Sequence, residues 1–189
     1  MFQVTGTIEG IADILFNAPP DIEEFEEAKG TKKRPSTMSI EEKQERALDR
    51  LHQDARGLFL PPGGFEKCLF TGSDYAGLKD GKRALSTLLK ATLFLTEDPR
   101  LFVAGSLATR PDYIHEKLGR VPPRTGGMAV IRRPALNPGW QAKFMMTMTA
   151  ARVAEYDRRM AREPGGSLVG LGGWRPRYGR FLVKEWKRT

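Results

Sequence analysis

The stretch from Gly165 to Trp186 limits the folds open to this chain more than any other segment. It begins as a glycine-dense loop, continues with arginines interspersed with aromatic residues, and ends in a pattern typical of a strand over 180–186. Glycine permits positive φ angles and close backbone approach. Arginine next to Trp and Tyr supplies phosphate donors and stacking surfaces. The residues alone leave two interpretations open: a ligand-binding loop, or a turn whose arginines are simply solvated.

Charge divides the 189-residue chain into two unequal parts. Residues 1–109 hold 14 Lys and Arg against 17 Asp and Glu, whereas residues 110–189 hold 17 against 6. The second part therefore carries a net charge of +11, and most of its excess is arginine near glycines and aromatic residues. A locally basic half of this kind is typical of a polyanion site and favours nucleic acid over a protein that is basic only for solubility.

Hydrophobic periodicity and turn residues predict both strands and helices. Phe2, Val4 and Ile8 alternate with polar residues, and Ser39 with Glu42 fits a capping box. Residues 51–61 are either two short strands around a turn at 55–57 or a helix that ends before Gly57. The expected strands are 2–10, 92–96, 101–104 and 180–186, with 127–133 and 140–149 as an antiparallel hairpin; the expected helices are 40–49, part of 63–78, 82–91 and 153–162.

This order predicts an α+β fold in which one antiparallel sheet is covered by helices on one face, as in the ferredoxin-like arrangement. We expect a single domain over 1–189. Two segments rich in charge, glycine and proline, 18–38 and 105–126, are expected to be mobile insertions, the second as a long loop.

Several classes of protein are disfavoured by what the sequence lacks. No apolar run reaches the roughly 18 residues of a membrane span. Cys68 is the single cysteine, which excludes an internal disulfide and cysteine-rich zinc sites. The first residues show no basic and apolar regions of a secretory signal. We therefore expect a cytoplasmic protein that does not interact with membranes.

Catalytic chemistry has little support in the sequence. His52 and His115 lie in different segments, and Cys68 is expected in a helix as a core residue. Neither a phosphate-binding P-loop nor a dinucleotide-binding glycine pattern is present. We expect no enzyme activity, no catalytic residues, no metal and no cofactor. The carboxylates of 21–27 leave a metal-dependent nuclease as a third possibility.

Binding residues are expected where arginines, aromatic residues and glycines come together. Trp174 and Tyr178 flank two arginines, so that stacking surfaces alternate with phosphate donors. The predicted nucleic-acid-binding residues are Arg132, Arg133, Gly170, Gly172, Trp174, Arg175, Arg177, Tyr178 and Arg180. Further phosphate contacts are predicted at Lys32, Lys33, Arg34, Arg120 and Arg124.

Three segments carry a resemblance to a known family. The residues 4–17, 57–61 and 169–181 resemble a group of small phage and prophage proteins, which in turn are similar to the RAMP superfamily of CRISPR effector backbone subunits. The resemblance implies a ferredoxin-like protein that coats single-stranded nucleic acid, as a homo-oligomer or within a larger nucleoprotein assembly. It implies contacts from Gly170, Gly172, Arg175, Arg177 and Arg180.

The leading prediction is thus a protein that binds single-stranded RNA or DNA without cleaving it. The alternative is a phage-encoded inhibitor or scaffold that binds a host protein through 21–27 or 105–126. The sequence does not choose between RNA and DNA.

Overall fold

The computed structural model describes residues 1–19, 38–120, 128–149 and 165–188. The predicted helix over 153–162 lies outside these residues, as does nearly all of the predicted insertion over 18–38. The described elements, in chain order, are β1 (Phe2–Gly10), β2 (Ile14–Leu15), α2 (Ile40–Leu48), β3 (Gln53–Asp54), β4 (Gly57–Leu58), α3 (Pro62–Tyr75), β5 (Lys79–Asp80), β6 (Arg83–Ala84), α4 (Leu85–Thr92), β7 (Leu93–Leu95), β8 (Arg100–Val103), β9 (Ser106–Leu107), β10 (Tyr113–Arg120), β11 (Met128–Leu136), β12 (Gln141–Met148), the helical turn η2 (Gly165–Val169) and β13 (Phe181–Arg188).

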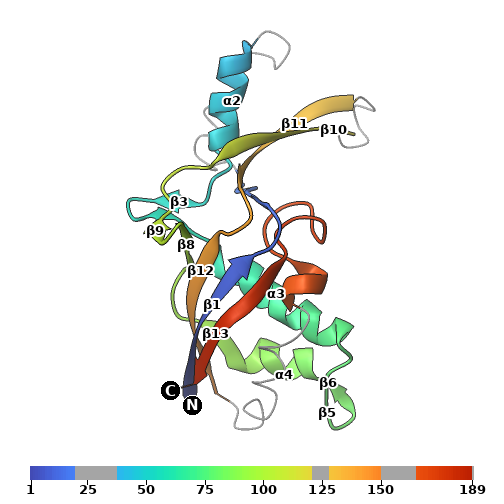
Figure 1. Ribbon diagram of the computed structural model, residues 1–189. Coiled ribbons are helices and arrows are strands. Elements are labelled where there is room, and N and C mark those ends of the chain that lie inside the picture. The colour runs from blue at the N-terminus through green and yellow to red at the C-terminus, as the bar shows by residue number, and fades with distance from the viewer. Residues whose placement is uncertain (20–37, 121–127, 150–164, 189) are drawn as a thin grey trace.

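Six of the described strands form one antiparallel sheet in the order β13-β1-β12-β8-β9, with β7 also paired to β12. β1 is central, and its alternation works as predicted: Val4 and Ile8 are buried, whereas Gln3 is exposed. Both ends of the chain meet here, because Val4 is paired with Arg188. Figure 1 shows the two termini side by side at one end of the molecule.

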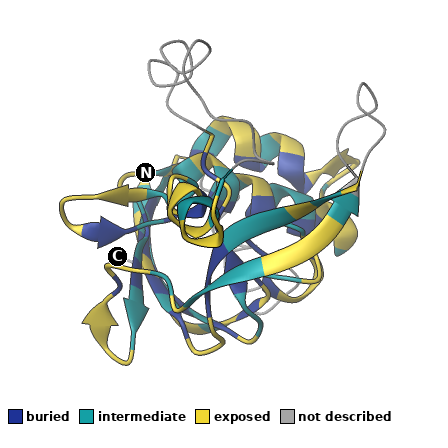
Figure 2. Ribbon diagram, turned by 90° about the horizontal axis from the view of Figure 1, so that it is seen from above, coloured by how far each residue is buried: buried dark blue, intermediate teal, exposed yellow. Residues whose placement is uncertain are grey.

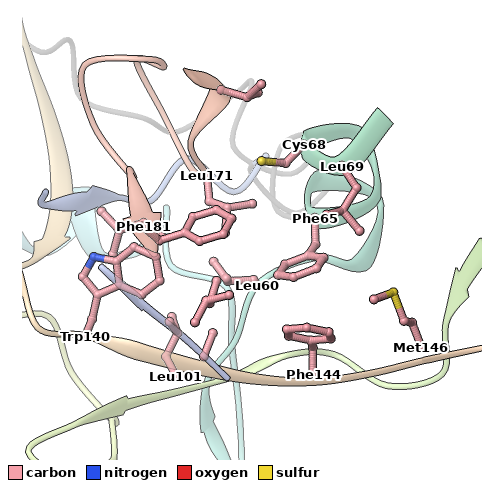
Figure 3. Close-up of a cluster of buried hydrophobic side chains, with 14 of the residues drawn as sticks. Leu60, Phe65, Cys68, Leu69, Leu101, Trp140, Phe144, Met146, Leu171 and Phe181 are labelled. Carbon is pink, nitrogen blue, oxygen red and sulfur yellow. The ribbon is translucent and has the colours of Figure 1, made fainter. Parts of the chain in front are cut away.

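Helices α3 and α4 lie together against one side of this sheet (Figure 1) and enclose the core. The rings of Phe65 on α3 and Phe144 on β12 approach to 4.9 Å between centroids. Figure 3 shows Leu171 and Phe181 completing the cluster from the C-terminal segment. Buried positions concentrate on the elements in the middle of the molecule, as Figure 2 shows. The glycine-rich segment is therefore anchored to the main core.

A second, three-stranded sheet, β10-β11-β2, extends beyond the main one, and α2 packs on it. In Figure 1 the β10–β11 pair and α2 lie at the end opposite the termini. The predicted long loop over 105–126 is therefore wrong in its described part, which contains β9 and β10. The segment does contain turn residues, but all eight residues of β10 pair with residues of β11.

The predicted hairpin of 127–133 with 140–149 is also wrong. β11 pairs with β10 and β2, whereas β12 pairs with β1, β7 and β8. After the turn at Gly139 the chain moves from one sheet into the other. Trp140 locks this crossing, because it is fully buried and its Nε1 donates to the Ala12 carbonyl at 2.9 Å. β12 pairs with β1 over eight residue pairs, and burial of the apolar face that the two strands share outweighs a hairpin between β12 and β11.

Several local predictions are confirmed. Ser39 and Glu42 form both hydrogen bonds of the capping box of α2. Residues 53–58 form the two short strands rather than a helix. The helix expected within 63–78 is α3, which ends at Tyr75 before the positive-φ Gly77. The α+β class with antiparallel sheets is confirmed, and the ferredoxin-like assignment within it stays a prediction.

Candidate nucleic-acid interface

The segment 165–180 is held in shape by glycines with positive φ. Gly172 has a φ of +74°, and a Cβ there would lie 2.5 Å from the Leu15 carbonyl oxygen. Gly179 has a φ of +72°, and a Cβ there would overlap the Leu171 carbonyl. Gly170 adopts a φ of +71°. The dense glycines are therefore required by close backbone packing.

Backbone hydrogen bonds tie this segment to the residues that follow β1. The Gly173 amide donates to the Leu15 carbonyl at 2.8 Å, and the Gly179 amide donates to the Asp13 carbonyl at 2.7 Å. The Ile11 amide donates in turn to the Arg180 carbonyl at 2.8 Å. The backbone between these anchors therefore has a defined position, which reduces the ordering cost of a binding surface.

Trp174 lies half-buried under two cations. The Arg133 guanidinium lies 4.3 Å from the centroid of its ring, and Lys117 Nζ lies 5.1 Å from it. The His115 ring meets Trp174 edge to face at 5.7 Å. Trp174 is thus less free than the predicted stacking platform, and its main role in the structure is to position Arg133 by a cation–π contact.

Tyr178 lies in the same aromatic cluster. Its hydroxyl is 3.2 Å from His115 Nε2, and its ring is 6.2 Å from that of Trp174. Tyr113 closes the cluster by donating to Asp13 Oδ2 at 2.8 Å. Burial, followed by this hydrogen bond to Asp13, raises the pKa of Tyr113 to about 12. Ring contacts and the Tyr178–His115 hydrogen bond thus join β10 to the C-terminal segment.

An open groove of about 570 Å³ runs between α3 and the C-terminal segment. Three cationic side chains line it: Lys67 from α3, Arg133 from β11 and Arg175. None of the residues that line it in the described part of the chain is a carboxylate. Its lining residues are Asn17, Lys67, Thr71, Tyr75, Arg133, Leu168, Val169, Gly172, Gly173, Trp174, Arg175 and Pro176.

Arg133 is the most unusual of the three. Its Nε is buried and has no hydrogen-bond partner among the described residues. Burial, with a smaller effect from Arg50, lowers the pKa of the Arg133 guanidinium. The adjacent Arg132 is different, because its Nε donates to Glu116 Oε1 at 2.7 Å. Of the two predicted arginines, only Arg133 lines the groove, whereas Arg132 is paired with Glu116.

The other predicted residues distribute unevenly. Arg175, Arg177 and Arg180 are exposed, but only Arg175 lines the groove, and Arg177 lies over the Tyr178 ring at 5.8 Å. The side chain of Arg120 lies outside the described residues, as do Lys32, Lys33, Arg34 and Arg124.

Sequence reasoning missed three residues of this surface: Lys67, Lys117 and Asn17. Lys67 and Lys117 are far from the glycine-rich stretch along the chain, and only the folded arrangement brings them to it. A partial signal existed for Lys67, because it is a cation on the polar side of a helix whose apolar side includes Phe65 and Leu69.

The described residues offer little for catalysis. They include no group of three or more His, Cys, Asp and Glu that could hold a metal. Burial raises the pKa of the Cys68 thiol to about 12. Burial also lowers the pKa of His52, which therefore favours its neutral form.

None of the described helices has the length and apolarity needed to cross a membrane.

Comparison with solved structures identifies a similar fold. A chain in the cryo-EM structure of the Type III-B Cmr-beta bound to cognate target RNA matches with a TM-score of 0.53 and 12% identity. The match covers 99% of this chain and 60% of that chain, so this chain spans about three-fifths of the neighbour's length. At this identity the likeness concerns the fold alone. No protein-family model and no curated protein matches the chain.

Proposed function

We propose that this protein binds single-stranded RNA along the groove between α3 and the C-terminal segment. The observation that carries the proposal is the set of three cations, Lys67, Arg133 and Arg175, in a groove without a lining carboxylate. A phosphodiester offers Arg133 an anionic acceptor that the described residues do not supply. Sequence-independent binding to phosphates is the expected outcome of such a surface.

The fold neighbour supports RNA as the preferred nucleic acid, because that structure holds a target RNA. It also supports the resemblance to CRISPR backbone subunits. The order β13-β1-β12-β7 is the one expected of a ferredoxin-like sheet, in which the first strand lies inside the sheet with the last strand beside it. We further infer a non-enzymatic role within a homo-oligomer or a larger nucleoprotein assembly.

Fluorescence anisotropy with labelled oligonucleotides tests the proposal. Single-stranded RNA, single-stranded DNA and duplex would be titrated with the full chain, with and without magnesium and across a salt series. Three phosphate contacts predict a slope of about −2 for the logarithm of the affinity against the logarithm of salt. Magnesium-dependent shortening of the strand would identify a nuclease instead.

Two matched substitutions locate the site. Arg133→Ala should weaken RNA binding by about tenfold and reduce the salt slope by about 0.7, because one phosphate contact is lost. Arg132→Ala removes the neighbouring arginine, whose partner is Glu116, and should leave the affinity nearly unchanged. Equal effects of the two substitutions would refute the assignment of the groove. The double variant Arg175→Ala with Arg177→Ala should weaken binding without unfolding the protein.

A protein partner is the second candidate, and one surface favours it. Leu118, Met128 and Val130 are about half exposed or more. Leu118 and Val130 face each other across β10 and β11. An apolar face on a projecting pair of strands is a common feature of protein interfaces. If wild-type protein binds none of the oligonucleotides at low salt, this candidate replaces RNA binding.

A further inference from the structure

A small apolar cavity lies directly behind the groove. It has a volume of about 160 Å³ and opens between the residues after β1, the start of α3 and the C-terminal segment. Most of its wall is aliphatic or aromatic, including Ile14, Phe16, Leu60, Phe65 and Leu171. The same side chains belong to the main core, so the cavity has rigid walls.

The cavity and the groove share part of their lining. Asn17, Gly172, Gly173 and Arg175 line both. Because Gly172 and Gly173 carry no side chains, the cavity and the groove adjoin there with only backbone between them. A chain whose phosphate lies on Arg175 would therefore have the next chemical group, the nucleoside, at the mouth of the cavity.

The size of the cavity matches one aromatic ring. An engineered apolar cavity of about 150 Å³ in another protein accepts benzene, so a space of this size admits a single six-membered ring. A purine, with two fused rings, requires more room. Polar side chains are also among the lining residues: the Asn17 amide offers donors and an acceptor, and the His52 imidazole offers one donor and one acceptor when neutral.

We propose that this cavity receives one pyrimidine base of the bound strand, while the adjoining groove holds its phosphate. The inference rests on the proposed function and deepens it. The apolar wall contributes the burial of the ring faces, and Asn17 and His52 meet the polar edge of the base. Burial lowers the pKa of His52, which keeps its ring neutral and suited to that edge near neutral pH. The protein thereby gains a preference for pyrimidines that phosphate contacts alone do not provide.

Two glycines at the start of α3 offer a matched test. Gly64 lines the cavity, and a Cβ there would meet only Pro61 Cγ at 3.6 Å. Gly63, the residue before it, is absent from the cavity lining, and a Cβ there has no heavy atom within 4 Å. Gly64→Leu should fill the cavity, whereas Gly63→Leu places the same side chain outside it. Both replace a helical glycine by a better helix former.

The probes are three RNA decamers of equal length: uridine, adenosine and an abasic ribose-phosphate strand. We expect wild-type protein to bind the uridine decamer about tenfold more tightly than the abasic one, in line with burial of one base. Adenosine should gain less. Gly64→Leu should reduce the uridine affinity to the abasic level and leave the abasic affinity unchanged, and Gly63→Leu should behave as wild type. Arg133→Ala should weaken all three.

Each outcome decides between the two proposals. Equal binding of the uridine and abasic decamers by wild-type protein overturns the base pocket but leaves the phosphate groove intact. The same holds if folded Gly64→Leu retains full uridine affinity. Absence of binding to every decamer overturns both. Should Gly64→Leu fail to fold, fluorine NMR of a 5-fluorouridine decamer with wild-type protein gives the answer: a base in the cavity produces a separate, shifted resonance, and its absence refutes the pocket.

Discussion

The packing of Gly179 gives the sharpest test of how the C-terminal segment is built. We consider Gly179→Ala with Gly77→Ala as its control. Both glycines have a positive φ, of +72° and +63°, so both substitutions force alanine into the left-handed region at a cost of about 1–2 kcal/mol. They differ in surroundings, because a Cβ at Gly77 would have no heavy atom within 4 Å, whereas a Cβ at Gly179 would overlap the Leu171 carbonyl.

The overlap adds a second cost at Gly179 only. Relief of the clash moves the backbone and weakens two hydrogen bonds, from the Leu171 amide to the Gly179 carbonyl at 2.9 Å and from the Gly179 amide to the Asp13 carbonyl at 2.7 Å. At about 1 kcal/mol for each bond, the free energy of unfolding should fall by about 3–4 kcal/mol in Gly179→Ala. Gly77→Ala should lose at most about 2 kcal/mol.

Thermal unfolding followed by far-ultraviolet circular dichroism measures the difference. For a domain of this size about 1 kcal/mol corresponds to about 2–4 °C in Tm, so Gly179→Ala should melt about 10 °C below wild type and Gly77→Ala only a few degrees below. Below its Tm, Gly179→Ala should also bind RNA more weakly, because the displaced segment carries Arg175. Equal losses of Tm in the two variants would refute the close packing of residues 171 and 179.

Three further predictions concern stability and reactivity elsewhere in the chain. The guanidinium of Arg100 holds the pKa of Asp54 at about 2. The ion pair therefore stabilises the fold above about pH 4, and this stabilisation is lost as the pH falls through 2. Urea unfolding midpoints of wild type and Asp54→Asn should differ above about pH 4 and converge near pH 2. The buried thiol of Cys68, with its pKa raised to about 12, should react with a disulfide reagent about a hundredfold more slowly in the native protein than in denaturant, and equal rates would contradict its burial. Ser39→Ala removes one half of the capping box with Glu42 and should lower the free energy of unfolding by about 1 kcal/mol in a denaturant titration, whereas an unchanged midpoint would show that the cap is not formed.

Local patterns in the sequence predicted elements well and their partners poorly. The alternation in β1 and the capping box at Ser39 depend on neighbours within a few residues, so both could be predicted from the sequence. The partner of β12 depends on which apolar face fits best across the whole fold. The turn at Gly139 suggested a return onto β11, and only the buried Trp140 with the long β1–β12 register shows why the chain crosses to the other sheet.

The candidate site shows the same division between composition and position. The basic second half of the chain drew attention to the arginines near the glycine-rich segment. It did not distinguish Arg132 from Arg133, because Met128–Leu136 has no clean alternation and the register of β10 on β11 decides which of the two meets Glu116. Nor could it supply Lys67, which reaches the groove from a helix distant in the chain.

The state of Arg133 links the stability of the free protein to its proposed activity. A buried donor without a partner costs about 1–3 kcal/mol, and the cation–π contact with Trp174 at 4.3 Å offsets only part of this. A residue chosen for stability alone at this position would be apolar or paired, as the neighbouring Arg132 is with Glu116. A phosphate in the groove would give the partly buried guanidinium an opposite charge through its other nitrogens, while the buried Nε keeps its environment. The binding free energy therefore gains from a buried cation that no described residue neutralises in the unbound fold. That coupling is the physical reason to expect Arg133, rather than the more exposed Arg177 or Arg180, to dominate the affinity.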